Sequence, residues 1–85
     1  MFAISAISNR NICLRECAKI IQLAKDNNCK ITLICHGKVG TSDSMLSLAS
    51  LAISKDNGLV LKLEGLNSTD ESKVYHELKE IFKWK

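Results

Sequence analysis

The chain has 85 residues, of which 46% are hydrophobic and 25% charged, with a net charge of +3 at pH 7. These ordinary values exclude a disordered chain, and the length predicts a single domain over residues 1–85. The basic residues are spread along the chain and cluster only at Lys79, Lys83 and Lys85, without the basic stripe and interleaved aromatic residues of a typical nucleic-acid-binding module.

The first half of the chain alternates strand and helix patterns. Phe2–Ser8 has strand character. Apolar residues then recur at i, i+3, i+4 and i+7, which predicts a helix near Arg15–Lys25. Lys30–Cys35 returns to strand character, and His36-Gly37 suits a tight turn into a short strand over Lys38–Thr41.

The second half predicts two more helices around one strand. Hydroxyl and carboxylate side chains offer N-cap oxygens for a helix over Ser44–Ala52, and Leu59–Leu63 is the clearest strand of the chain. Ser68 and Glu71 have the spacing of a capping box for a last helix over Thr69–Lys83. The order β-α-β-β-α-β-α predicts an α+β two-layer, open-faced sandwich, in which a four-stranded antiparallel sheet carries three helices on one face.

The cysteine pattern indicates free thiols. No charged start or small-residue cleavage site of a signal peptide precedes the four cysteines, so we expect a cytoplasmic protein without a disulfide framework. Their spacings of 4, 12 and 6 match no usual zinc pattern, and we expect no metal and no other cofactor. No apolar run approaches the roughly 18–20 residues that cross a bilayer, so we expect no membrane insertion.

Two helix starts carry the candidate chemistry. The two histidines have no serine–acid or carboxylate partner near them in sequence, so we expect no free-standing catalysis. Cys13 and Arg15 fall at the start of the first helix, where backbone N–H groups favour anions and a thiol is expected to be nucleophilic. The alternative is that Cys13 and Cys17 are small buried residues one turn apart. Ser44 is either a plain helix cap or a phosphorylation site.

At this point the chain resembles HPr, the small phosphocarrier family of the bacterial sugar phosphotransferase system. The length, the element order and both loop–helix junctions agree with that family. Its first junction, Gly-Leu-His-Thr-Arg-Pro-Ala, corresponds here to Asn11–Cys17 (NICLREC). Gly37-Lys38, followed six residues later by Ser44 and an apolar helix, resembles the region of the family's regulatory serine.

Two departures from the family pattern bear on function. The resemblance places Cys13 where the family has its phosphorylated histidine, and Glu16 where it has a proline. Arg15, which in the family helps to neutralise the phosphoryl group, is kept, as is Ser44. The lost histidine argues against ordinary phosphoryl relay, and a carboxylate at Glu16 opposes an incoming anion.

This combination is similar to catabolite-repression paralogues of HPr, which lack the histidine and keep the serine. It implies a bacterial regulatory module that is phosphorylated at Ser44 and docks through the apolar residues Ile12, Leu14, Met45 and Leu46. The implied partners are the HPr kinase/phosphorylase and a transcriptional regulator.

Two alternatives stay open. In the first, Cys13 accepts the phosphoryl group itself, and the partners are enzyme I and sugar-specific EIIA-type proteins. In the second, the chain is a small nucleic-acid-binding domain, which requires an exposed basic face and gives salt-dependent binding.

Overall fold

The structure is a computed structural model that describes residues 2–65 and 68–84. Its elements are β1 (Phe2–Ser8), α1 (Leu14–Asp26), β2 (Lys30–Cys35), β3 (Lys38–Thr41), α2 (Met45–Ala49), β4 (Gly58–Glu64), α3 (Ser68–Leu78) and β5 (Phe82–Trp84). The side chains of Ser68 and Glu71, whose spacing predicts a capping box, lie outside the described part of the chain.

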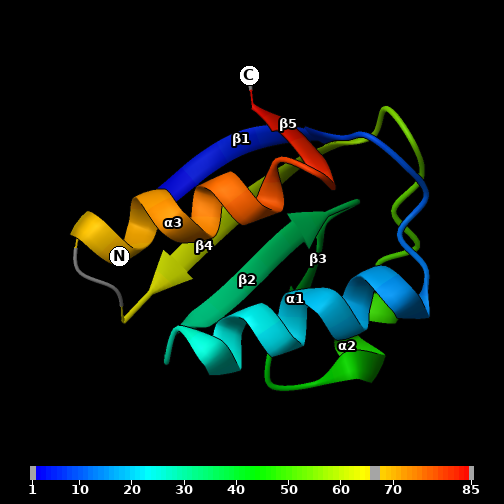
Figure 1. The fold of residues 1–85 in the computed structure, drawn as a ribbon. Coiled ribbons are helices and arrows are strands. Elements are labelled where there is room, and N and C mark those ends of the chain that lie inside the picture. Colours follow the sequence, from blue (N-terminus) through cyan, green and yellow to red (C-terminus); the bar gives the residue numbers. More distant parts are fainter. Residues whose placement is uncertain (1, 66–67, 85) are drawn as a thin grey trace.

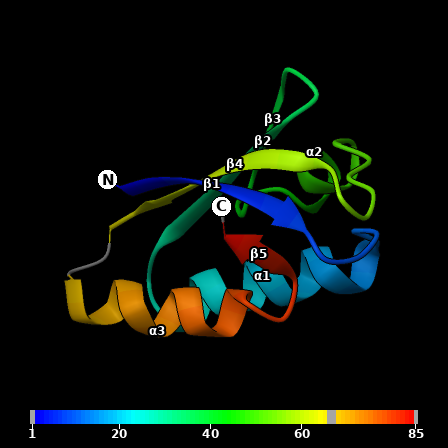
Figure 2. The same cartoon turned by 90° about the horizontal axis from the view of Figure 1, so that it is seen from above.

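The strands form one antiparallel sheet in the order β3-β2-β4-β1-β5. The long helices α1 and α3 lie on the same face of this sheet (Figures 1 and 2). The short helix α2 contacts β3 and α1. This arrangement confirms the α+β sandwich with an antiparallel sheet and three helices.

Alternation along the strands separates the core from the open face. Leu59, Leu61 and Leu63 are buried on β4, whereas Val60 and Lys62 between them are only partly buried. The buried side chains of the other strands and of the helices join these leucines in one core. Its largest fully buried members include Ile20, Ile31, Leu33, Leu48, Leu51, Leu78, Ile81 and Phe82.

The prediction of four strands and a last helix reaching Lys83 is wrong at the C-terminal end. Helix α3 ends at Leu78, whose carbonyl accepts a hydrogen bond from Ile81 N–H at 3.0 Å. The chain then turns into β5, which pairs antiparallel with β1 through the partners Ser8 and Phe82. Because β5 supplies the outer neighbour of β1, backbone groups on that edge gain partners that a longer helix would leave to water.

The β2–β3 hairpin confirms the predicted tight turn. Cys35 pairs with Lys38, so two residues make the loop. Both have positive φ, 56° at His36 and 73° at Gly37, as a type I′ turn requires. This turn matches the twist of the two strands and fixes their register, which sets where β3 delivers the chain to α2.

Helix α2 ends at Ala49 and is shorter than the predicted Ser44–Ala52. The N–H groups of Leu51 and Ala52 bond to carbonyls only three residues back, and φ reaches 50° at Ala52, so the chain turns away instead of continuing the helix. It packs closely over Gly40 of β3. A Cβ atom at Gly40 would lie 2.8 Å from both Leu51 Cδ1 and the Ser47 carbonyl oxygen. The absence of a side chain at Gly40 therefore lets α2 sit against the sheet and positions Ser44 at its start.

Candidate functional site

The first junction, residues 10–16, leads from β1 into α1, and Cys13 is the exposed N-cap residue of that helix. The preceding residue anchors the junction, because Ile12 N–H donates to the Ile53 carbonyl at 2.9 Å. Ile12 is only 8% exposed and belongs to the core. Its predicted role as an exposed docking residue is therefore wrong: an apolar residue just before the N-cap packs inward when the helix buries its first turn.

Glu16, in the first turn of the same helix, caps the N-terminus of that helix with its side chain. The backbone N–H of Cys13 donates to Glu16 Oε1 at 2.9 Å, which satisfies a backbone group at the start of the helix. This hydrogen bond, aided by the charges of Arg10 and Arg15, lowers the pKa of the Glu16 carboxyl against the opposing effect of desolvation. Glu16 thus stays ionised at neutral pH and places its negative charge beside Cys13.

Two arginines share a surface cavity with these residues. The cavity holds about 550 Å³, and Arg10, Asn11, Cys13, Leu14, Arg15 and Glu16 line it. Cys13 and Arg15 thus line the same surface cavity. Arg10, three residues before Cys13, was not predicted. Its Nη2 donates to the Glu80 carbonyl at 2.9 Å, and the Glu80 carboxylate pairs with Lys19, so contacts beyond the junction hold Arg10 in place.

Of the four thiols, that of Cys13 is the exposed one. Cys17 and Cys35 are buried and Cys29 is partly buried, and desolvation is the largest cause that raises the pKa of each of these three thiols. The reading of Cys13 as a small buried residue is therefore wrong, whereas for Cys17 it is confirmed. Within the described residues, no group of three or more His, Cys, Asp or Glu side chains could hold a metal ion.

The second junction, residues 41–47, leads from β3 into α2. Ser44 is the exposed N-cap residue, and its Oγ accepts a hydrogen bond from Ser47 N–H at 3.3 Å. The side chain of Ser47 returns the contact by donating to the Ser44 carbonyl at 2.8 Å. Ser47 Oγ also accepts from Thr41 N–H at 3.0 Å, which ties the helix start to the end of β3. Ser44 is thus at the surface on a locally braced backbone.

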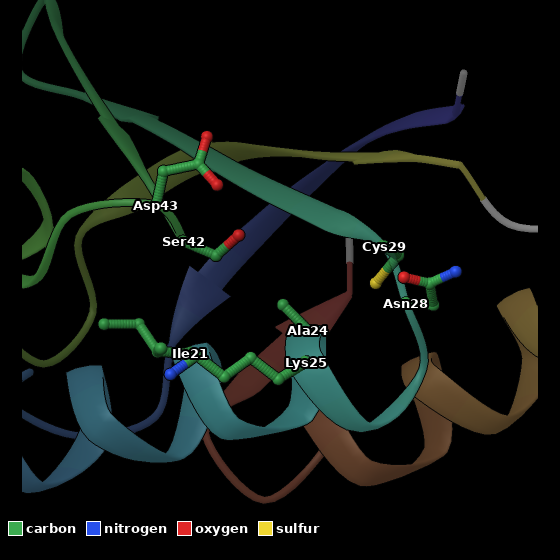
Figure 3. A pocket seen from close by; sticks show the side chains of 7 residues that line it. All are labelled: Ile21, Ala24, Lys25, Asn28, Cys29, Ser42 and Asp43. Carbon is green, nitrogen blue, oxygen red and sulfur yellow. The ribbon is translucent and has the colours of Figure 1, made fainter.

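Charges near Ser44 partly compensate each other. Lys30 Nζ lies 3.7 Å from Asp43 Oδ2, and both side chains are solvent-exposed, that of Asp43 more than that of Lys30. A cavity of about 370 Å³ adjoins this pair, between the second half of α1 and the loop that contains Asp43 (Figure 3). Ile21, Ala24, Lys25, Asn28, Cys29, Ser42 and Asp43 line it. This cavity borders the second junction and lies toward the opposite end of α1 from Cys13.

Exposed apolar side chains flank both junctions. Leu14 is 62% exposed at the start of α1, and Met45 and Leu46 are 38% and 82% exposed at the start of α2. Figure 1 places α2 beside α1, at the same end of the molecule. Three of the four predicted docking residues therefore offer apolar surface, and a fourth exposed residue, Val39 on β3, was not predicted.

The described aromatic side chains near the C-terminus pack inward. Phe82 is buried, and the rings of Tyr75 and Trp84 meet edge to face with centroids 5.2 Å apart. Nucleic-acid modules that use an open sheet display aromatic rings for base stacking. Here Phe82 belongs to the core, and Tyr75 and Trp84, both partly buried, pack against it. Trp84 also lines a surface cavity together with Lys79 and Lys83, so one partly buried ring lies beside basic residues at this end of the described chain.

Comparison with known proteins agrees with this architecture. Residues 4–83 match the PTS-HPr family, described as the PTS HPr component phosphorylation site. The crystal structure of HPr-C-His from Thermoanaerobacter tengcongensis is similar, with a TM-score of 0.73 and 24% identity over 94% of this chain and 92% of that one. The histidine-containing phosphocarrier protein of Mycoplasma has a TM-score of 0.74 and 19% identity over 93% of each chain. No curated protein matched this chain.

The fold and the two helix starts define a small α+β protein of the phosphocarrier class. The chain belongs to the HPr family of the sugar phosphotransferase system, as its sequence resemblance predicts. None of the described helices is long and apolar enough to cross a membrane.

Proposed function

We propose that this HPr-family protein is a regulatory interaction module of the bacterial phosphotransferase system, phosphorylated at Ser44 and not an ordinary phosphoryl relay. The observation that carries the proposal is the contrast between its two helix starts. Ser44 presents an exposed hydroxyl beside the exposed side chains of Met45 and Leu46. At the first helix start, where the family resemblance puts Cys13 in the place of the phosphorylated histidine, the Glu16 carboxylate accepts the Cys13 N–H.

A phosphoryl group on Ser44 would act through charge. It adds about −1.5 to −2 charges at neutral pH to a surface whose nearest apolar residues are Met45 and Leu46. Lys30, by pairing with Asp43, offsets part of the negative charge that already stands next to Ser44. The modified surface would favour a partner with basic residues and repel one with acidic residues, which is the behaviour of a switch.

The proposed partners act in the cytoplasm. They are an HPr kinase/phosphorylase, which would modify Ser44, and a transcriptional regulator, which would bind the modified surface. Leu14, Met45 and Leu46 would form the apolar part of the docking surface, and the protein itself would catalyse no reaction. Enzyme I and EIIA-type proteins remain partners only of the alternative, in which Cys13 accepts the phosphoryl group.

The test is labelling by an HPr kinase/phosphorylase from a Gram-positive bacterium with ATP, read by peptide mass mapping. We expect one phosphoryl group on Ser44, lost in Ser44→Ala and kept in Ser50→Ala. Ser50 is a matched control because it is an exposed serine just after the same helix. Labelling that persists in Ser44→Ala would overturn the proposal. So would an unlabelled wild type under conditions in which the kinase labels another HPr.

A further inference from the structure

The N-terminus of α1 already has an anion that comes from the chain itself. The Glu16 carboxylate accepts the Cys13 N–H at 2.9 Å, three residues upstream on the same helical turn. Backbone N–H groups at a helix start are the donors that phosphate groups use when they bind there. At the Cys13 position, that donor is engaged by an oxygen of the protein.

The positive charges of the first junction are also partly neutralised by Glu16, which belongs to the same chain. Arg10, Arg15 and Glu16 line the same cavity as Cys13. Arg10 is further fixed by its hydrogen bond to the Glu80 carbonyl at 2.9 Å. An arriving anion at Cys13 would have to share these two guanidinium groups with Glu16 and would face its negative charge at short range.

We propose that Glu16 is a built-in anion that closes the first junction, an autoinhibitory contact that disfavours the approach of phosphoryl groups and other anions to the Cys13 thiol. The contact needs both the N-cap position of Cys13 and the carboxylate three residues later, and the sequence Cys13-Leu14-Arg15-Glu16 supplies both. It deepens the proposed function by giving a physical reason why the Cys13 route is closed, and it is independent of whether Ser44 is phosphorylated.

A pair of alkylating reagents measures this effect at the thiol. The Cys13 thiolate attacks the methylene carbon of iodoacetate or iodoacetamide and displaces iodide, but the first reagent is an anion and the second is neutral. The ratio of their rates at Cys13 therefore reports the local charge and does not depend on the thiolate fraction. At low ionic strength, we expect Glu16→Gln to raise the iodoacetate-to-iodoacetamide ratio about 3- to 10-fold over wild type.

The matched control is Glu64→Gln, which removes one carboxylate on β4 and leaves the first junction intact. Mass mapping of the modified peptides assigns the rates to Cys13. An unchanged ratio in Glu16→Gln would overturn the proposal, as would an equal rise in Glu64→Gln.

A second measurement observes the contact directly. We expect the Cys13 amide proton in NMR spectra of the wild type to follow the titration of the Glu16 carboxyl, and this response to disappear in Glu16→Gln. If the chemical shift of the Cys13 amide proton does not change as Glu16 titrates, the contact is contradicted, even if the alkylation rates changed. Neither measurement involves Ser44, so failure here and failure of the proposed switch are distinguishable.

Discussion

The two helix starts have the same architecture and opposite chemistry. Each has an exposed N-cap residue that contacts a residue three positions later, Glu16 at the first and Ser47 at the second. At the first start, a carboxylate accepts from the Cys13 backbone and brings a full negative charge. At the second, the Ser44 hydroxyl accepts from the Ser47 backbone without adding charge. One site is thus occupied by its own chain, while the other keeps a hydroxyl at the surface.

Their surroundings extend this contrast. Arg10 and Arg15 border the first start and are shared with Glu16, so the charges there are already engaged. The second start has Met45 and Leu46 exposed beside it and a solvent-exposed Lys30–Asp43 pair. The two helix starts thus share a backbone frame but differ in the charged and apolar side chains around them.

The largest expected effect on stability comes from a substitution that pushes α2, and with it the second helix start, away from the sheet. Gly40→Ala places a Cβ within 2.8 Å of the Ser47 carbonyl oxygen, so α2 must shift, and we expect a loss of about 2–3 kcal/mol in the free energy of unfolding. Urea denaturation measures it. Gly37→Ala is the control: φ is positive there but no atom lies within 4 Å, so the loss should be nearer 1 kcal/mol. A smaller loss for Gly40→Ala than for Gly37→Ala would contradict the packing argument.

The contributions of the two helix starts to kinase docking can be compared by placing a charge at an exposed leucine of each. Leu46→Glu should reduce the rate of Ser44 labelling by the kinase at least about tenfold, because it puts a charge into an apolar contact. Leu14→Glu, at the exposed leucine of the first helix start, should reduce it less. Both variants should keep their stability within about 0.5 kcal/mol. Equal labelling rates in wild type and Leu46→Glu would remove Leu46 from the docking surface.

The cap at Ser44 contributes a smaller amount to stability. Ser44→Ala removes the acceptor for Ser47 N–H and should cost about 0.5–1 kcal/mol, at the low end for caps because the hydrogen bond is 3.3 Å long. Ser50→Ala, which loses only a contact to the Ser47 carbonyl, should cost less. Thermal unfolding of both variants checks this order, and the reverse order would argue against Ser44 as the structural cap.

The smallest expected effect is the pH dependence contributed by Glu16. The pKa of Glu16 in the folded state lies below its ordinary value of 4.5. Its ionised form therefore adds stability above about pH 4.5, and this is lost as the pH falls through the folded pKa. Because Glu16 is partly exposed, we expect less than about 0.5 kcal/mol. Urea denaturation of wild type and Glu16→Gln between pH 6 and pH 3 measures this. The difference between their free energies of unfolding should shrink as the pH falls, and a constant difference would contradict the capping contact.

Sequence periodicity predicted most of the fold because burial acts on long segments. The alternating leucines of Leu59–Leu63 and the helical stripe through Cys17 and Ala24 are both buried as their spacing predicts. The error at the C-terminal end has a local cause. Ile81 and Phe82 extend the apolar spacing of α3, and only the neighbouring edge of β1 makes a three-residue strand favourable there.

The candidate site was predictable in its residues but not in its contacts. Cys13, Arg15 and Ser44 lie at the helix starts where the sequence places them. The role of Glu16 as a cap was missed, because the usual capping box begins with serine or threonine and this one begins with Cys13. Ile12 was misplaced because its burial depends on α1 packing against the sheet, a tertiary contact that a lone apolar residue in a loop does not reveal.

The most direct test of the account is to present the chain to two phosphoryl donors and record its intact mass. One reaction contains HPr kinase/phosphorylase and ATP, and the other contains enzyme I and phosphoenolpyruvate. The account predicts one phosphoryl group in the first reaction, on Ser44, and an unmodified chain in the second. A phosphoryl group on Cys13 after the second reaction, or an unmodified Ser44 after the first, would contradict it.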